Sequence, residues 1–82
     1  MDPIAQAVRD YILEEFLPGT PASELNADTP LITGGVLDSL ATIKLVSFLE
    51  EQYNITIEPH EANVDYLNSV DDIAKLVRQK QG

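Results

Sequence analysis

The chain has 82 residues and no cysteine, which leaves room for one domain and excludes disulfides, thiolate metal sites and a cysteine nucleophile. Its 14 acidic residues outnumber 5 basic ones and give a formal net charge of −9. This charge repels nucleic acid and anionic membrane surfaces and suits protein partners that carry basic docking patches, although on charge alone its simplest role is to keep a small protein soluble.

A hydrophobic content of 44% indicates a folded domain rather than a disordered chain, and we expect a single domain over residues 1–82. No apolar run approaches the roughly 18 residues of a membrane helix, and the start at Asp2 and Pro3 lacks the basic, then apolar pattern of a signal peptide. We therefore expect a cytoplasmic protein that contacts no membrane, and the early helix start and short C-terminal tail favour a free-standing chain. The lone His60 cannot supply the ligands of a zinc site, so we expect no metal centre.

The first predicted helix begins at Asp2, whose carboxylate suits an N-cap, with Pro3 in the first helical position. It should end at Leu17, because Pro18 and Gly19 follow. Its core-facing stripe is predicted to contain Ile4, Val8, Ile12 and Phe16.

A long connection follows over residues 18 to about 37, and connections of this length inside a small domain are usually functional. Leu25, Leu31 and Ile32 are expected to anchor it against the core. Gly34 and Gly35 give its backbone conformational freedom just before the next helix.

The second predicted helix is capped by Asp38 and runs to about Gln52, with Asn54 marking its end. It is apolar over so wide an arc that we expect it to lie centrally in the fold. The residues of this arc are Leu40, Ile43, Leu45, Val46, Phe48 and Leu49.

A short helical segment is predicted near His60–Val64, after an extended stretch of three residues that is too short to form a sheet. Ser69 and Asp72 have the spacing of a capping box and should open a last amphipathic helix ending near Gln79. The predicted fold is all-α: a small antiparallel four-helix bundle with three main helices and one short helix.

The strongest candidate for chemistry is Ser39, whose hydroxyl follows a glycine loop and the acidic Asp38 at the start of a helix. A hydroxyl in the first turn projects from the end of the bundle and is open to covalent modification. Asp and Ser are also ordinary helix-start residues, so the tripeptide Asp38–Leu40 taken alone is explained better as a structural cap than as a modification site.

The run from Leu31 to Leu40, LITGGVLDSL, resembles the signature of acyl carrier proteins, in which Asp-Ser-Leu follows a glycine-containing loop. Three later runs resemble that family's second helix, the loop before its third helix and the entry into its fourth. They are LVSFLEEQY at 45–53, ITIEP at 55–59 and LNSVDDI at 67–73, so the resemblance spans nearly the whole chain in the right order.

The resemblance implies a carrier that catalyses nothing itself. A phosphopantetheinyl transferase would move 4′-phosphopantetheine from coenzyme A onto Ser39, with Asp38 part of the attachment motif. The arm would then hold an acyl or aminoacyl group as a thioester for a loading ligase and downstream biosynthetic enzymes. The expected partner surface comprises Leu40, Ile43, Lys44, Ser47, Asn63 and Tyr66, although core packing explains Ile43 about as well.

Two positions depart from carriers of fatty-acid synthesis, which usually have acidic residues soon after the modified serine. Here these positions are Ala41 and Lys44, and a basic docking patch would meet Lys44 unfavourably. This difference favours a carrier for a dedicated biosynthetic pathway.

Two other classes of function stay open at this stage. The first is an acidic helical adaptor that binds a basic partner and is never modified. The second is a small hydrolase using Ser39 and His60, which lacks a Gly-x-Ser-x-Gly elbow and has little room for a substrate pocket.

Overall fold

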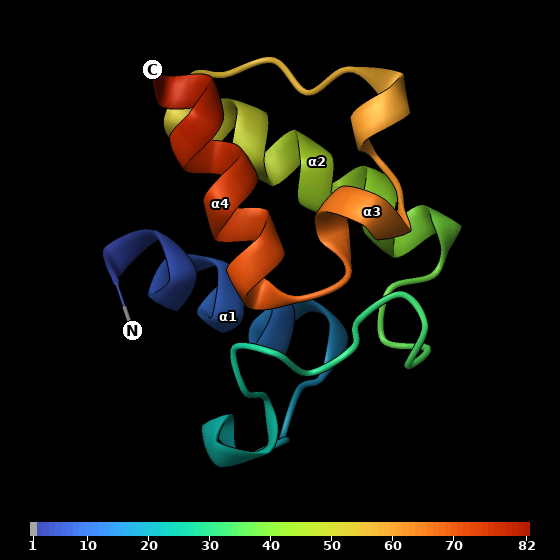
Figure 1. Cartoon of the computed structure of the whole chain (residues 1–82). Helices are drawn as coiled ribbons and strands as arrows, with labels where there is room; N and C mark the ends of the chain where they lie inside the picture. Colours follow the sequence, from blue (N-terminus) through green and yellow to red (C-terminus); the bar gives the residue numbers. More distant parts are fainter. Residues whose placement is uncertain (1) are drawn as a thin grey trace.

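The computed structural model describes residues 2–82, so Met1 lies outside the described residues. Four α-helices make up the fold: α1 (Pro3–Phe16), α2 (Ser39–Tyr53), α3 (Val64–Leu67) and α4 (Val70–Gln81). Two 3₁₀ turns, η1 (Ala22–Glu24) and η2 (Pro59–Glu61), lie in the connections (Figure 1). The all-α bundle of three main helices and one short helix is confirmed, and residues 2–82 contain no strand.

The helix starts follow from their capping side chains. Asp2 accepts a hydrogen bond from the Ala5 N–H at 2.9 Å, and Asp38 accepts one from the Ala41 N–H at 2.8 Å. Ser69 accepts from the Asp72 N–H at 3.0 Å and begins α4. Each bond satisfies an amide that has no partner inside its own helix.

The helix ends follow from backbone geometry. α1 ends at Phe16, one residue before the predicted Leu17, which serves as its C-cap. α2 extends to Tyr53, and Asn54 closes it in the left-handed conformation at φ 52°. Asn54 is therefore confirmed as the end of α2, since Asn tolerates this conformation better than most residues.

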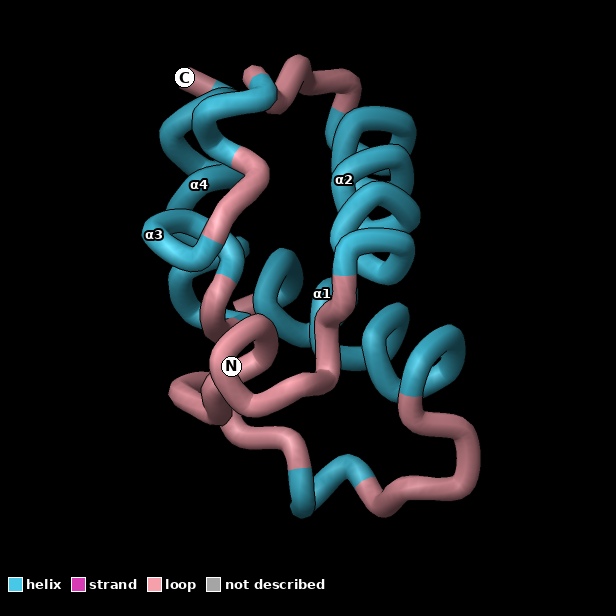
Figure 2. Tube along the Cα trace, turned by 90° about the vertical axis from the view of Figure 1, so that its right-hand side faces the viewer, coloured by secondary structure: helices cyan, strands magenta, loops and turns pink. Residues whose placement is uncertain are grey.

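The core lies where α1 and α4 cross, and α2 packs against α4 from the other side (Figures 1 and 2). α4 buries five residues and forms the central element, whereas α2 buries three. The prediction that the second helix lies centrally was therefore wrong. Its apolar arc divides between the core and the molecular surface, where Leu40 and Ile43 are exposed. The fully buried large side chains are Val8, Ile12, Leu25, Leu31, Leu45, Leu49, Leu67, Val70, Ile73, Leu76 and Val77.

The long connection between α1 and α2 is anchored as predicted. Leu25 is 2% exposed and Leu31 is fully buried, while Ile32 is partly buried against the core. This anchoring explains how 22 residues, 17–38, outside any α-helix remain ordered beside the bundle.

Two boundaries differ from the prediction. The short helix expected near His60–Val64 is split into η2 and the later α3, because the Asn63 side chain accepts from the Asp65 N–H at 2.9 Å and starts a new helix. α4 continues past the predicted Gln79 to Gln81.

An ion pair between Arg78 and Asp2 joins the last turns of α4 to the start of α1. No helix within residues 2–82 is both long and apolar enough to cross a membrane.

Candidate functional site

Ser39 is the first residue of α2, and its side chain is exposed. Asp38 fixes this helix start through its side chain, which accepts from Ala41, and through its carbonyl oxygen. That carbonyl accepts the Thr42 N–H at 2.9 Å and the Thr42 hydroxyl at 2.8 Å. The Ser39 hydroxyl therefore stands at the amino end of a 15-residue helix, where the helix dipole favours negative charge.

The loop before Ser39 is shaped by two glycines. Gly35 has φ +83°, a left-handed conformation that residues with a side chain rarely adopt. At Gly34 a Cβ atom would clash with the Pro30 carbonyl oxygen. The Leu31 carbonyl accepts both the Val36 and the Leu37 N–H groups, at 2.8 and 2.9 Å, and so closes the turn. The predicted need for glycine before the second helix is thereby explained.

Asn68, at the junction between α3 and α4, ties this loop to the C-terminal part of the chain, and sequence reasoning missed this contact. Its side-chain oxygen accepts the N–H groups of Ile32 at 2.9 Å and Thr33 at 3.0 Å. Its backbone carbonyl accepts the Leu31 N–H at 2.7 Å. An Asn between two helices is a hint of capping, but nothing in the sequence indicates a partner 36 residues away.

A cleft of about 790 Å³ opens beside Ser39, which is within the range of small-molecule sites. One wall is α2, with Thr42, Ile43, Val46 and Ser47. The opposite wall is the segment from Ile57 to Val64, and Ile32 and Leu37 line the end near the glycine loop. Most of these side chains are apolar, so the cleft suits an uncharged chain with a few polar groups.

The structure gathers most, but not all, of the predicted site residues. Asp38, Ser39, Ile43, Ser47 and Asn63 all line the cleft. Leu40 and Lys44 lie with Asp38 on a smaller hollow between the end of α1 and the start of α2. Tyr66 borders a third hollow, between α3 and α4, and does not line the cleft.

The exposure of the apolar residues on α2 decides between core packing and a surface role for Ile43. Leu40 is 62% exposed and Ile43 is 63% exposed. Core packing therefore does not explain Ile43. Its place on the surface beside Ser39 fits the predicted partner surface, which nonetheless stays a prediction.

His60 is exposed, and its carbonyl oxygen accepts a hydrogen bond from the Asn63 side chain. It does not line the cleft beside Ser39, and no hydrogen bond joins the two residues in the described chain. The contact that a Ser–His nucleophile requires is therefore not formed. Across residues 2–82 there is also no cluster of three or more His, Asp or Glu side chains that could hold a metal ion.

Comparison with known proteins adds to this geometry. A family model described as "Phosphopantetheine attachment site" matches residues 6–77. An acyl carrier protein of Chlamydia caviae is 32% identical over 92% of this chain and 92% of its own length. A D-alanyl carrier protein of Lactococcus lactis subsp. cremoris is 32% identical over 80% of this chain and 84% of its own length.

Solved structures are also similar to this chain. One of them is described as "Crystal structure of FAD-dependent dehydrogenase", and the matched chain is 34% identical with a TM-score of 0.77. The match covers 85% of this chain and 97% of that chain, so the matched chain is the shorter of the two.

Proposed function

This chain belongs to the phosphopantetheine-attachment family of carrier proteins, and we propose that Ser39 is the residue that bears its covalent phosphopantetheine arm. The carrier role and the covalent prosthetic group follow from the family. The assignment to Ser39 is supported by one observation above all. Ser39 is an exposed hydroxyl at the start of a long helix and also lines the mostly apolar cleft of about 790 Å³.

The residues present fit such a group in charge and in shape. A phosphodiester on the Ser39 oxygen would lie at the positive end of the α2 dipole. The cleft beside it offers apolar side chains from Ile43, Val46 and Ile57 for an uncharged arm and its cargo. Asp38 holds the helix start in place and leaves the hydroxyl exposed.

In the attachment step, the Ser39 oxygen would attack the phosphorus of coenzyme A that carries the pantetheine, and the Ser39 proton would pass to the transferase. The new Ser39 O–P bond would form as the pyrophosphate bond breaks, and adenosine 3′,5′-bisphosphate would leave. The transferase and its Mg²⁺ would supply the charge stabilisation. The attached group supplies a terminal thiol, which is absent from this cysteine-free chain and which holds the cargo as a thioester.

We propose a dedicated biosynthetic pathway with an acyl or aminoacyl cargo. Lys44 is exposed on α2, within the surface that we propose for partners, where it would oppose a basic docking patch. Ala41 does not support this argument, because it is 7% exposed and belongs to the core. The similarity to D-alanyl carrier proteins adds support for an aminoacyl cargo.

The partners proposed are a phosphopantetheinyl transferase, a loading ligase and downstream enzymes, which the chain would meet as a monomer in the cytoplasm. The similar chain in the structure described as an FAD-dependent dehydrogenase is shorter than this one. Because a chain similar to this carrier occurs in a structure of that description, we add to the proposed partners a flavin-dependent dehydrogenase that would oxidise the tethered cargo. Loading the protein and measuring flavin reduction on mixing with that dehydrogenase would test this addition.

Intact-protein mass spectrometry tests the assignment of Ser39. The protein is incubated with coenzyme A, Mg²⁺ and a broad-specificity phosphopantetheinyl transferase. The parent and Ser47→Ala should each gain the mass of one phosphopantetheine, whereas Ser39→Ala should gain none. Ser47 is the matched control because it is an exposed serine of the same helix that lines the same cleft.

Two results would contradict the assignment. If the Ser39→Ala variant still gains the mass of one phosphopantetheine, the arm is attached to another residue. A folded parent that gains no mass, while a control carrier is modified by the same transferase, would favour the unmodified acidic adaptor.

A further inference from the structure

The cleft beside Ser39 has one wall that does not belong to the helix carrying Ser39. This wall runs from Ile57 through η2 to the start of α3. α3 packs against α4 and η2, whereas its contacts with α2 are few. The separation between the two walls is therefore set by whatever holds the segment 54–63 in place.

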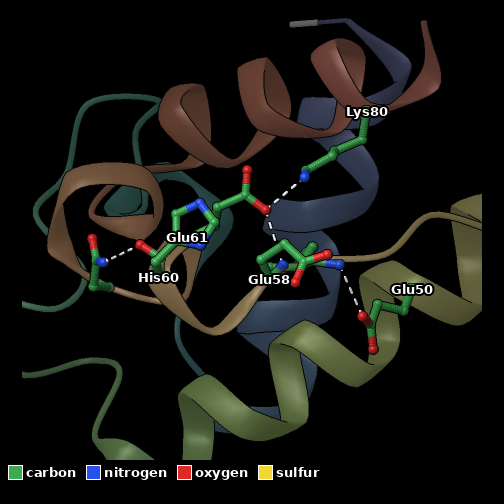
Figure 3. Close-up of polar contacts among 7 residues, drawn as sticks. Glu50, Glu58, His60, Glu61 and Lys80 are labelled. Atoms are coloured by element: carbon green, nitrogen blue, oxygen red, sulfur yellow. Dashed lines mark hydrogen bonds and ion pairs between the residues drawn. The ribbon is translucent and has the colours of Figure 1, made fainter.

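Besides the burial of Ile57 in the core, two carboxylates bond to this segment. Glu50 of α2 accepts the Ile57 N–H at 2.9 Å, which fixes the segment where it leaves α2. Glu61 accepts the Glu58 N–H at 2.9 Å and contacts the Lys80 ammonium at 2.6 Å (Figure 3). Lys80 lies in the last turn of α4, so the second attachment joins the cleft wall to that helix.

Glu61 is the most buried acidic residue described in the chain, at 9% exposed. The Glu61 side chain is 12% exposed, so removing its Lys80 partner leaves a carboxylate that is largely shielded from water and has lost its counter-charge. The favourable response is for the segment to move outward and hydrate the carboxylate. That movement would draw Pro59 and Ala62, which line the cleft, away from α2.

We propose that the Glu61–Lys80 ion pair sets the width of the cleft beside Ser39 and so controls how well the cleft shields the tethered cargo from water. Glu61 and Lys80 are positioning residues: they act through Ile57, Pro59 and Ala62 and do not line the cleft themselves. This inference rests on the proposed attachment at Ser39.

The experiment uses the protein loaded at Ser39 with an environment-sensitive fluorescent acyl-pantetheine. Collisional quenching by iodide or acrylamide then reports how far solvent reaches the cargo. Lys80→Met should raise the quenching constant roughly twofold, as expected when the open arrangement becomes comparably populated with the closed one. Lys80→Arg, which keeps the charge, should retain the parent value.

Arg78→Met is the matched control. It removes an ion pair from the same helix, but its partner Asp2 lies at the start of α1 and not on the cleft wall. Its quenching constant should equal that of the parent. An unchanged constant in Lys80→Met, or an equal rise in Arg78→Met, would overturn the proposal.

Amide hydrogen exchange in the unloaded protein separates this inference from the assignment of Ser39. The Ile57 and Glu58 amides, whose acceptors are the Glu50 and Glu61 carboxylates, should exchange on the order of tenfold faster in Lys80→Met. The exchange rates of both amides should be unchanged in Arg78→Met. If these amides do not respond, the cleft wall is not held by Lys80, whatever residue carries the arm.

Discussion

The side-chain oxygen of Asn68 accepts the backbone N–H of Ile32 at 2.9 Å, across 36 positions of sequence. The same oxygen accepts the Thr33 N–H at 3.0 Å. One amide thus fixes two consecutive backbone groups of the loop that leads to Ser39. Asn68 lies at the junction between α3 and α4. Its side chain therefore joins this junction to the glycine loop that precedes Ser39, the proposed site of modification.

Asn68→Ala should destabilise the protein and slow phosphopantetheine transfer to Ser39. Two backbone N–H groups lose their acceptor, and each loss costs about 1–3 kcal/mol where the group is buried and less where water reaches it. Urea unfolding and a mass-spectrometric time course would measure the two effects. Asn68→Asp keeps the acceptor oxygen and should retain more of both. If Asn68→Ala matches the parent in stability and in rate, the loop is held by other contacts.

Asp38 has two separable roles, as a helix cap and as a negative charge beside Ser39. Asp38→Asn keeps a capping oxygen, so its free energy of unfolding should stay near that of the parent. Asp38→Ala loses the bond to the Ala41 N–H and should lose about 0.5–2 kcal/mol. Both variants should be modified more slowly if the transferase recognises the charge. Normal transfer to Asp38→Asn would limit Asp38 to its structural role.

Lys44→Glu should speed acylation of the loaded protein by enzymes of fatty-acid synthesis. The exposed helix face would then carry the negative charge that their basic docking patches attract. Steady-state acylation at two salt concentrations would measure the effect, which should shrink as salt rises. Lys75→Glu makes the same change of charge on α4, outside both the cleft beside Ser39 and the hollow that Lys44 lines, and is the control. Equal rates in Lys44→Glu and the parent would contradict this explanation of specificity.

Ala41→Asp is not a useful companion substitution, because Ala41 is buried and an aspartate there would destabilise the core.

Stability should fall as the solution becomes acidic, partly through Glu61. The Lys80 ammonium, followed by the Glu58 N–H, holds the pKa of the Glu61 carboxyl below its usual range. The unfolded chain therefore binds this proton more readily than the folded protein. The stabilisation is complete above the ordinary carboxyl pKa of about 4.3 and is lost as the pH falls through the folded pKa.

Urea unfolding between about pH 7 and pH 3 measures this dependence. Glu61→Gln should flatten the acid limb of the stability curve relative to the parent. Asp2 adds a second contribution of the same sign, because the Ala5 N–H, and after it Arg78, lowers the pKa of its carboxyl. Asp2→Asn is therefore the companion variant. An unchanged slope in Glu61→Gln would mean that Lys80 does not lower the pKa of Glu61.

The sequence predicted those elements that depend on local signals. Asp2, Asp38 and Ser69 cap helices because a side-chain oxygen next to a helix reaches amides two or three residues away, and that spacing is visible in the sequence. Asn54 ended α2 for a similarly local reason. The position of Ser39 at the start of its helix followed directly.

Features that depend on distant contacts could not be predicted in this way. The apolar arc of α2 indicated burial, but only the packing of the other helices determines which part of the arc meets the core and which borders the cleft. The family resemblance placed Tyr66 on the partner surface together with Asn63, yet the two residues line different hollows. The pair Glu61–Lys80 spans 19 positions between a loop and a helix end, and charge patterning alone does not reveal it.

The two walls of the cleft come from separate stretches of the chain, since α2 forms one and residues 57–64 form the other. Substitutions in the second stretch can reshape the chamber without disturbing the helix start that a modifying enzyme would recognise. Selection on the cargo can therefore act on residues 57–64 while the start of α2 stays unchanged. A fold divided in this way can diversify in what it carries while one transferase continues to serve all of its descendants.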